Sequence, residues 1–140
     1  LEQNLGVDIR SPGGSASKGG VSVTVHGVRT ESQLGEYTKP EDGNEYVIPD
    51  IEITNGTGEP LTVSTLLQMR VKTGAGLSYT ADIMGSSSLS QSYNEGSDIA
   101  PDESRRGELA FQVEEGESPL YFVFDFLDLT DAYKAFWELR

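Results

Sequence analysis

His26 is the residue best suited to acid–base chemistry, and it is the only histidine among the 140 residues of the chain. A Ser-His-Asp triad would have to use it, because such a triad needs an imidazole to move the proton of the nucleophile. The abundant serines are not set in a G-x-S-x-G motif. His26 also falls on the polar face of an expected strand, so the sequence favours a solvent-facing histidine over a catalytic one.

Carboxylates are the second candidate for chemistry, since the chain has 23 aspartates and glutamates. Two carboxylates at a suitable separation could hydrolyse a glycosidic bond, but among so many acids such a pair arises by chance. Carboxylate oxygens are also calcium ligands. Two acidic clusters could supply them: Asp98, Asp102 and Glu103, and Glu114, Glu115 and Glu117. Neither cluster has the D-x-D-x-D-G spacing of a calcium loop, so a solvated acidic surface is the favoured interpretation.

Asn55-Gly56-Thr57 matches the acceptor sequence for N-glycosylation on what should be an exposed turn. The same residues are typical of a tight turn, because asparagine and glycine tolerate positive φ. Turn formation alone explains the motif and is the favoured interpretation.

Six aromatic residues near the C-terminus could form the wall of a ligand groove. They are Phe122, Phe124, Phe126, Tyr133, Phe136 and Trp137. Most are expected in the core, where aromatic side chains bury the largest apolar area. Because aromatics occur on both parities, one face of this region is a candidate for an exposed partner site.

The charge of the chain excludes two classes of partner. The formal net charge is −13, and the 10 basic residues are scattered along the chain. Nucleic acids and anionic membrane surfaces attract clustered lysine and arginine, so neither is expected to bind. The chain has no cysteine, which excludes disulfides and thiolate metal sites. No run of 18 apolar residues is present, so no transmembrane segment is expected.

The stretch that must organise the rest of the chain is 45–63, EYVIPDIEITNGTGEPLTV. Val47, Ile51 and Ile53 share one parity, and polar residues follow the other, which predicts a strand with one buried face. The first half of this strand is apolar on both parities, so it could be covered on both sides. Pro49 cannot donate a ladder hydrogen bond, so it is expected at an edge, at a bulge, or where the N–H would point outward.

Alternation predicts further strands at residues 21–28, 67–72, 77–81, 104–113 and 120–126. Strands 67–72 and 77–81 are expected to form a hairpin, and Gly27 is expected to mark a bulge. Residues 132–139 fit either a short helix or a strand. The shared parity of Tyr133, Ala135, Trp137 and Leu139 favours a closing strand.

The remaining segments are expected to be irregular. Residues 1–20 are rich in glycine and serine, which predicts a flexible linker before a single domain at 21–140. Two polar loops, 30–44 and 82–101, are long enough to be mobile or functional. Part of the second loop suits the covering of a sheet edge. Short strands, regular turns and no long helix together predict an antiparallel β-sandwich.

Three segments resemble a known family. Residues 45–63 are similar to its segment of a hydrophobic strand, an asparagine, a small turn and Glu-Pro-Leu; residues 99–113 and 120–125 are similar to its next two strands. The family is the telokin-like domain of unknown function found in secreted and lipid-anchored prokaryotic proteins. It is related in fold to the mycobacterial immunoprotective extracellular antigen. The resemblance covers about residues 21–139. Within this range the chain departs from the family at two positions: Pro49 replaces a β-branched residue, and Asp102 replaces a turn glycine.

The resemblance implies an immunoglobulin-like sandwich of seven or eight strands outside the cell or on its surface. The protein would be secreted or held by a lipid anchor upstream of Leu1. The family has no catalytic motif to carry over, so no catalytic, cofactor-binding or metal-binding residue is expected.

The leading functional hypothesis is a non-enzymatic extracellular binding module. Its partner, a protein or another envelope component, would bind through loops 30–44 and 82–101 or through a sheet edge. The alternative is a structural accessory domain of an envelope assembly or a homodimer through edge strands. Calcium binding and hydrolysis are less favoured.

Overall fold

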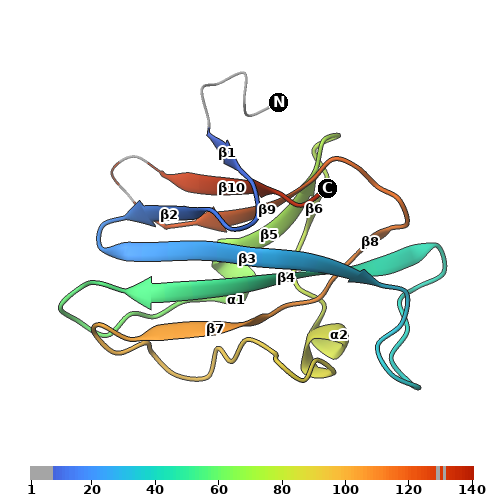
Figure 1. Cartoon of the computed structure of the whole chain (residues 1–140), viewed down its shortest axis with the longest axis horizontal. Coiled ribbons are helices and arrows are strands. Elements are labelled where there is room, and N and C mark those ends of the chain that lie inside the picture. The colour runs from blue at the N-terminus through green and yellow to red at the C-terminus, as the bar shows by residue number, and fades with distance from the viewer. Residues whose placement is uncertain (1–7, 129, 131) are drawn as a thin grey trace.

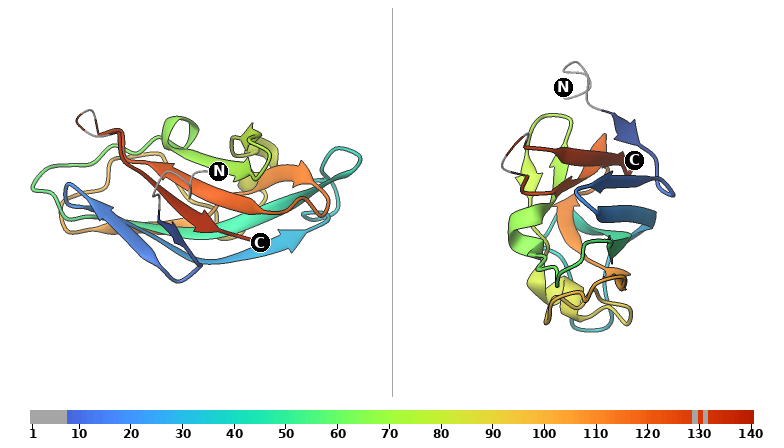
Figure 2. Two further views of the ribbon diagram at one scale, coloured as in Figure 1. Left: turned by 90° about the horizontal axis from the view of Figure 1, so that it is seen from above. Right: turned by 90° about the vertical axis from the view of Figure 1, so that its left-hand side faces the viewer.

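The computed structural model describes residues 8–128, 130 and 132–140. Its strands form two five-stranded sheets, with the orders β1-β10-β9-β5-β6 and β2-β3-β4-β7, and β8 also pairs with β4 (Figure 1). Figure 2 shows the sheets as two facing layers. The strands are β1 (Ile9–Arg10), β2 (Ser15–Lys18), β3 (Val21–Glu31), β4 (Asn44–Asn55), β5 (Met69–Thr73), β6 (Ser78–Tyr79), β7 (Ser104–Glu108), β8 (Phe111–Glu114), β9 (Leu120–Asp125) and β10 (Lys134–Glu138).

The predicted β-sandwich is confirmed, and every strand pair is antiparallel except β1 with β10. The described residues hold ten strands rather than seven or eight. The excess comes from short strands and from the division of the predicted strand 104–113 into β7 and β8. Two short helices, α1 (Thr65–Gln68) and α2 (Ile83–Ser87), complete this part of the chain.

Strand β4 is the centre of the second sheet, as its sequence predicts. It pairs with β3 along one side and with β7 and β8 along the other. Val47, Ile51 and Ile53 point into the main core between the sheets. Tyr46 and Ile48 face the other way and are also buried, in a second cluster with Leu89 and Ala110, so this half of the strand is covered on both sides as expected.

Pro49 lies where β4 changes partner. Residues Asn44–Val47 pair with β8, and Asp50–Thr54 pair with β7, so Pro49 falls in the gap between these two ladders. Its carbonyl accepts a hydrogen bond from the Leu109 N–H at 3.3 Å. The missing N–H of proline therefore costs no ladder bond on that side.

The core between the sheets is dominated by aromatic and β-branched side chains. Phe122 packs edge-on against Phe111, with ring centroids 6.3 Å apart, and is tilted against Trp137 at 5.8 Å. These side chains are fully buried and are among the largest in the core, so each contributes a large apolar area. The predicted bulge is also confirmed, because the register of β3 shifts between Val25 and Gly27.

The predicted flexible linker over 1–20 is wrong for residues 9–18, which form β1 and β2. Ala16 of β2 is 3% exposed and belongs to the main core. The Trp137 indole donates to the Gly14 carbonyl at 2.9 Å, which ties this segment to β10. Glycine and serine therefore serve turns and an edge strand here. Residues 1–7 lie outside the described residues.

Several boundaries differ from the expected ones. The strand predicted over 67–72 begins only at Met69. Residues 67 and 68 belong instead to helix α1, whose N-cap is Ser64. Strands β3 and β4 extend further than predicted, so the first loop spans only 32–43. Within the segment 132–139, residues Lys134–Glu138 form strand β10, as the parity of the segment favoured. Residues 91–93 lie along the outer edge of β7, so part of the loop 82–101 covers a sheet edge as expected.

Candidate functional site

His26 lies on the outer face of the second sheet. Its Nε2 is 2.7 Å from Oε1 of Glu52 on the neighbouring strand β4. Both side chains are partly exposed. This cross-strand contact is typical of a surface histidine, and in the described part of the chain it brings no hydroxyl nucleophile to the ring.

The two acidic clusters serve turns. Asp98 accepts a hydrogen bond from the Thr62 hydroxyl at 2.9 Å. Asp102 has a φ of 65°, which explains why a glycine is common at this position of the family. Across residues 8–128, 130 and 132–140, no three His, Cys, Asp or Glu side chains gather in an arrangement that could hold a metal ion.

Asn55 is fully buried, although its sequence matches a glycosylation acceptor. Its Nδ2 donates to the carbonyls of Glu59 and Ile99, each at 2.8 Å. Its Oδ1 accepts from the N–H of Thr57 at 2.9 Å and from the Thr57 hydroxyl at 2.6 Å. The nitrogen that a sugar would modify is thus committed to the fold. A turn follows Asn55 as predicted, but neither Asn55 nor Gly56 has the positive φ expected there, and the Asn55 side chain closes the turn instead.

The prediction that most of the aromatic residues near the C-terminus lie in the core is confirmed, and the candidate exposed face is wrong. All six aromatic residues belong to a buried cluster or pack against one. Phe136, on the outer face of the first sheet, is only 4% exposed and clusters with Tyr121 and Val123. Ile9 of β1 packs against this cluster, so the segment mistaken for a linker helps to cover the aromatic face.

An apolar groove of about 370 Å³ opens between α1 and α2 instead. Its apolar lining comes from Leu66 of α1, Ile83 of α2, Ala81 and Leu109. The rest of the lining consists of serines and threonines, whose hydroxyls can donate or accept hydrogen bonds. The described lining therefore combines an apolar surface with neutral polar groups and contains no titratable side chain.

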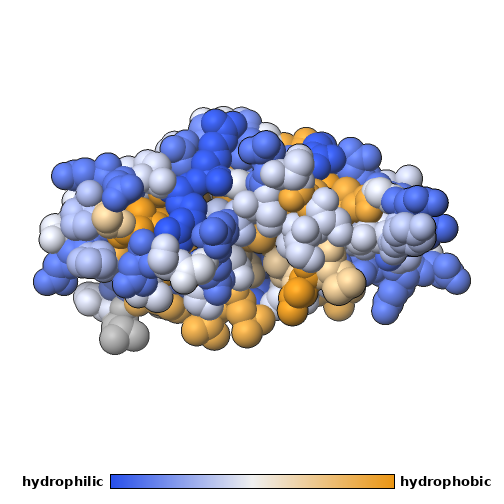
Figure 3. Space-filling view, turned by 90° about the horizontal axis from the view of Figure 1, so that it is seen from below, coloured by the Kyte–Doolittle hydropathy of each residue, from blue (hydrophilic) through white to orange (hydrophobic). Residues whose placement is uncertain are grey.

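Large apolar side chains stand in solvent beside this groove. Ile83 is 82% exposed, Met84 71% and Leu66 63%. Seen from below, where α2 lies, hydrophobic side chains reach the surface between hydrophilic ones (Figure 3). Three exposed apolar side chains next to one groove are characteristic of an interaction site.

Local hydrogen bonds hold both helices in place. The Ser64 hydroxyl accepts from the Leu67 N–H at 3.2 Å, while the Gln68 side chain accepts from the Ser64 N–H at 2.9 Å. Asp82 caps α2 by accepting from the Gly85 N–H at 2.7 Å. A Cβ on Gly85 would lie 2.8 Å from a ring carbon of Tyr46, so glycine lets α2 rest directly on the second core cluster.

Negative charge flanks the groove at the start of each helix. Asp82 is the cap of α2, and Glu95 accepts a hydrogen bond from the Thr65 N–H of α1 at 2.5 Å. Burial raises the pKa of Tyr46 beneath α2, and the charge of Asp82 raises it further. A positively charged group would therefore be favoured at the rim of the groove.

Two arginines of the second sheet are paired with acids from other strands of the same sheet. Arg29 contacts Glu108 at 3.0 Å, and Arg106 contacts Asp50 at 2.9 Å. Hydrogen bonds to these carboxylates raise the pKa of each guanidinium above its ordinary value. This face thus presents neutralised ion pairs.

Neither α1 nor the groove is predicted from the sequence. Helices of four and five residues are too short for hydrophobic periodicity to show. The one sequence signal for this site was the apolar pair Ile83-Met84 within a serine- and glycine-rich segment. No strand is predicted in that segment, so these residues are not expected to be part of the core. The predicted functional loop 82–101 does contribute α2, whereas 32–43 contributes nothing to the groove lining.

Solved structures of similar fold come from several bacteria. A conserved hypothetical protein from Bacillus anthracis is 19% identical, with 94% of this chain and 95% of that chain covered and a TM-score of 0.69. A proposed lipoprotein from Bacillus subtilis is 18% identical over 89% of this chain and 38% of that chain, with a TM-score of 0.66. The secreted protein MPT63 from Mycobacterium tuberculosis is 12% identical over 94% and 97%, with a TM-score of 0.67.

No functionally curated protein matches the chain. Within the described residues, none of the helices has the length and apolar character needed to span a bilayer. The model of a family described as "Domain of unknown function (DUF4352)" matches residues 12–133. The match spans the three segments on which the sequence resemblance rests, and the similar folds include a secreted protein and a proposed lipoprotein, so that resemblance is confirmed. The chain belongs to the DUF4352 family, a domain of unknown function.

Proposed function

We propose that this domain is a non-enzymatic binding module that acts outside the cell. Its groove between α1 and α2 would hold an apolar segment of a positively charged protein partner. The observation that carries this proposal is the exposure of Ile83, Met84 and Leu66 beside the groove. Covering apolar surface contributes about 25 cal/mol per Å², so these side chains favour a bound state.

The groove suits a segment of polypeptide. Leu66, Ile83 and Leu109 offer an apolar surface, and the serine and threonine hydroxyls around them can pair with backbone N–H and C=O groups of a partner. The absence of titratable side chains from the described lining favours binding over acid–base catalysis.

Charge favours a basic partner. The chain carries a net charge of −13, and Asp82 and Glu95 place carboxylates at the starts of the two helices that border the groove. An acidic partner would be repelled at long range, whereas a basic one would be attracted and would associate faster.

An extracellular location is supported by two of the similar folds, a secreted protein and a proposed lipoprotein. Placement at the cell surface, by secretion or by a lipid anchor, remains part of this proposal.

The alternative of a homodimer through edge strands receives less support from the structure. Edge strands β1 and β6 have only two residues each. The edge of β7 is already occupied, because the Tyr93 N–H donates to Glu108 at 2.9 Å and the Glu108 N–H donates to Gln91 at 2.8 Å. Short or covered edges disfavour pairing with a second chain.

We expect a short peptide of alternating leucine and lysine to bind at the groove, and the double variant Ile83→Ser/Met84→Ser to weaken this binding at least about tenfold. The reason is the loss of apolar surface on the partner-facing side of α2, where truncation leaves the core intact. Titrations followed by ¹⁵N–¹H NMR shifts would locate the site and give the dissociation constant.

Leu77→Ser is the matched control, because Leu77 is exposed but does not line the groove, and it should leave binding unchanged. A leucine–glutamate peptide should bind far more weakly if the acidic rim selects the partner. Equal loss in the Leu77 variant, or peptide shifts that map away from α1 and α2, would contradict the proposal.

A further inference from the structure

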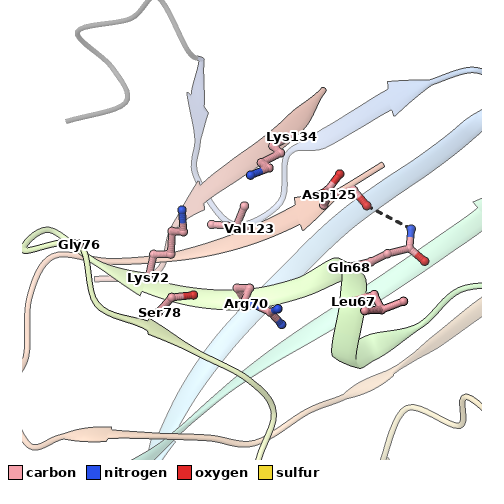
Figure 4. A pocket seen from close by; sticks show the side chains of 9 residues that line it. All are labelled: Leu67, Gln68, Arg70, Lys72, Gly76, Ser78, Val123, Asp125 and Lys134. Atoms are coloured by element: carbon pink, nitrogen blue, oxygen red, sulfur yellow. Dashed lines mark hydrogen bonds between the residues drawn. The ribbon is translucent and has the colours of Figure 1, made fainter. Parts of the chain in front are cut away.

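The outer face of the first sheet carries a shallow pocket of about 330 Å³ bordered by three cations. Arg70 and Lys72 come from β5, Lys134 comes from β10, and strand β9 lies between them. Figure 4 shows these side chains with Val123 between the two strands that carry them. Cations separated by more than 60 positions in sequence thus meet on one face.

The sheet geometry sets how these cations are spaced. Arg70 lies opposite Val123, and Lys134 lies opposite Asp125, so two strand spacings of about 4.8 Å separate β5 from β10. Arg70 and Lys72 are two residues apart on the same face, roughly 7 Å along β5. A ligand that contacts all three cations must therefore be extended and carry more than one anionic group.

These cations have no acidic partners among the residues that the structure describes. In the described residues no carboxylate lies within ion-pair distance of Arg70, Lys72 or Lys134. Arg70 donates through Nη1 to the backbone carbonyls of Leu66 and Met69, which orients its guanidinium. Asp125, the one carboxylate in the lining, accepts a hydrogen bond from the Leu127 N–H at 2.8 Å.

The two sheets differ in whether their basic residues are paired with acids. On a chain of net charge −13, Arg29 and Arg106 of the second sheet are paired with Glu108 and Asp50, whereas Arg105 donates to backbone carbonyls. The first sheet instead gathers three of the 10 basic residues around one pocket without pairing them. Mutual repulsion within such a cluster is relieved when an anion occupies it.

We propose that this pocket binds a ligand that carries two or more phosphate groups. The arginine fork can contact two oxygens of one phosphate, and each lysine offers three donors to another. A phosphate carries up to two charges near neutral pH, so it neutralises a cationic cluster better than a single carboxylate. This inference does not rest on the groove between α1 and α2, whose lining residues are different.

Pyrophosphate is the first probe. In about 150 mM NaCl, where charges more than about 8 Å apart are largely screened, we expect NMR shifts that map to β5 and β10, with a dissociation constant on the order of 1 mM. Lys72→Gln/Lys134→Gln should weaken this binding at least about fivefold. Asp125→Asn should strengthen it about twofold, because the amide oxygen still accepts from Leu127 while the negative charge is gone.

Lys39→Gln is the matched control, since Lys39 is an exposed lysine far along the chain from the pocket-lining residues, and it should leave binding within about twofold. Folding of every variant can be checked by its NMR spectrum. Three results would each overturn the proposal: no shifts at the pocket with about 20 mM pyrophosphate, an unchanged affinity in the double variant, or an equal loss in the Lys39 variant.

Soluble and lipid-borne phosphates can be told apart in the same design. Vesicles of phosphatidylcholine with phosphatidic acid present many phosphates on a surface, whereas pyrophosphate presents two in solution. Sedimentation with these vesicles that depends on Lys72 and Lys134 identifies a headgroup as the source of the phosphates. Pocket shifts with pyrophosphate but no sedimentation identify a soluble ligand.

Discussion

Replacing Gly107 by alanine is expected to lower the free energy of unfolding by about 3 kcal/mol or more. A Cβ at this position would lie 2.4 Å from Cα of Tyr93 and 2.5 Å from its backbone N. Backbone atoms cannot rotate away as a side chain can, so β7 and the segment 91–93 would have to separate. That movement would break the two hydrogen bonds between Glu108 and this segment. Urea unfolding followed by circular dichroism would measure the loss.

Gly27→Ala is the matched control for this prediction. Gly27 also lies in a strand of the second sheet, but no atom lies within 4 Å of where its Cβ would be. Alanine there should change the free energy of unfolding by less than about 1 kcal/mol. A Gly107 variant as stable as the wild type would show that residues 91–93 do not sit against β7.

Replacing Asn55 by alanine should cost about 3 kcal/mol, or roughly 10 °C in Tm. The amide makes four hydrogen bonds that join the end of β4 to the turn 55–59 and to Ile99. Alanine removes all four bonds and leaves the Thr57 N–H without its acceptor, while the carbonyls of Glu59 and Ile99 each lose one of two donors. Thermal unfolding measures the effect directly.

Asn55→Asp should be still less stable near neutral pH. It places a carboxylate oxygen against the same two carbonyls, so burial and repulsion favour the protonated acid in the folded state. A carboxyl whose folded pKa is raised stabilises the fold at low pH and loses that contribution as pH rises. The deficit relative to the wild type should therefore grow from about pH 4 to pH 7.

Asn94→Ala is the control for both variants, because Asn94 is exposed and accepts a single hydrogen bond from the Gly96 N–H. Its cost should stay below about 1 kcal/mol. If Asn55→Ala were as mild as Asn94→Ala, the buried network around Asn55 would not contribute to stability as the structure indicates.

The strands that could be predicted are those whose two faces differ. In β4, alternation of isoleucine with acidic residues revealed the buried face, and apolar residues on both parities revealed the part covered on both sides. In β9, alternation predicted the strand, although its first five residues are buried on both faces. These predictions succeed because burial acts residue by residue along a strand of fixed period.

The segment before Val21 could not be predicted in this way. Its strands have two and four residues, and the latter contains only one buried side chain. Strand β1 is held by pairing with β10, which is distant in sequence, whereas β2 forms a hairpin with β3 through Gly19 and Gly20. Composition alone therefore resembled a linker.

The candidate sites were missed for a related reason. Arg70, Lys72 and Lys134 appear scattered in sequence, and only the strand order β10-β9-β5 brings them together. Ile83 and Met84 were visible as apolar residues in a polar segment, but their exposure depends on how Asp82 and Gly85 set α2 on the core. Sites of this kind arise from topology, which a single sequence specifies only indirectly.

The buried turn at Asn55 also bears on the chemical lifetime of the protein. An Asn-Gly pair deamidates readily in a flexible chain. The glycine backbone nitrogen attacks the side-chain carbonyl carbon of asparagine, ammonia leaves, and hydrolysis of the resulting ring gives aspartate. Here the Gly56 N–H already donates to the Gly20 carbonyl at 2.7 Å, and the Asn55 amide is held by its four bonds. Deamidation must wait for this end of the sandwich to open. A molecule in which Asn55 has become aspartate is expected to open more readily, because a buried carboxylate at this position destabilises the fold.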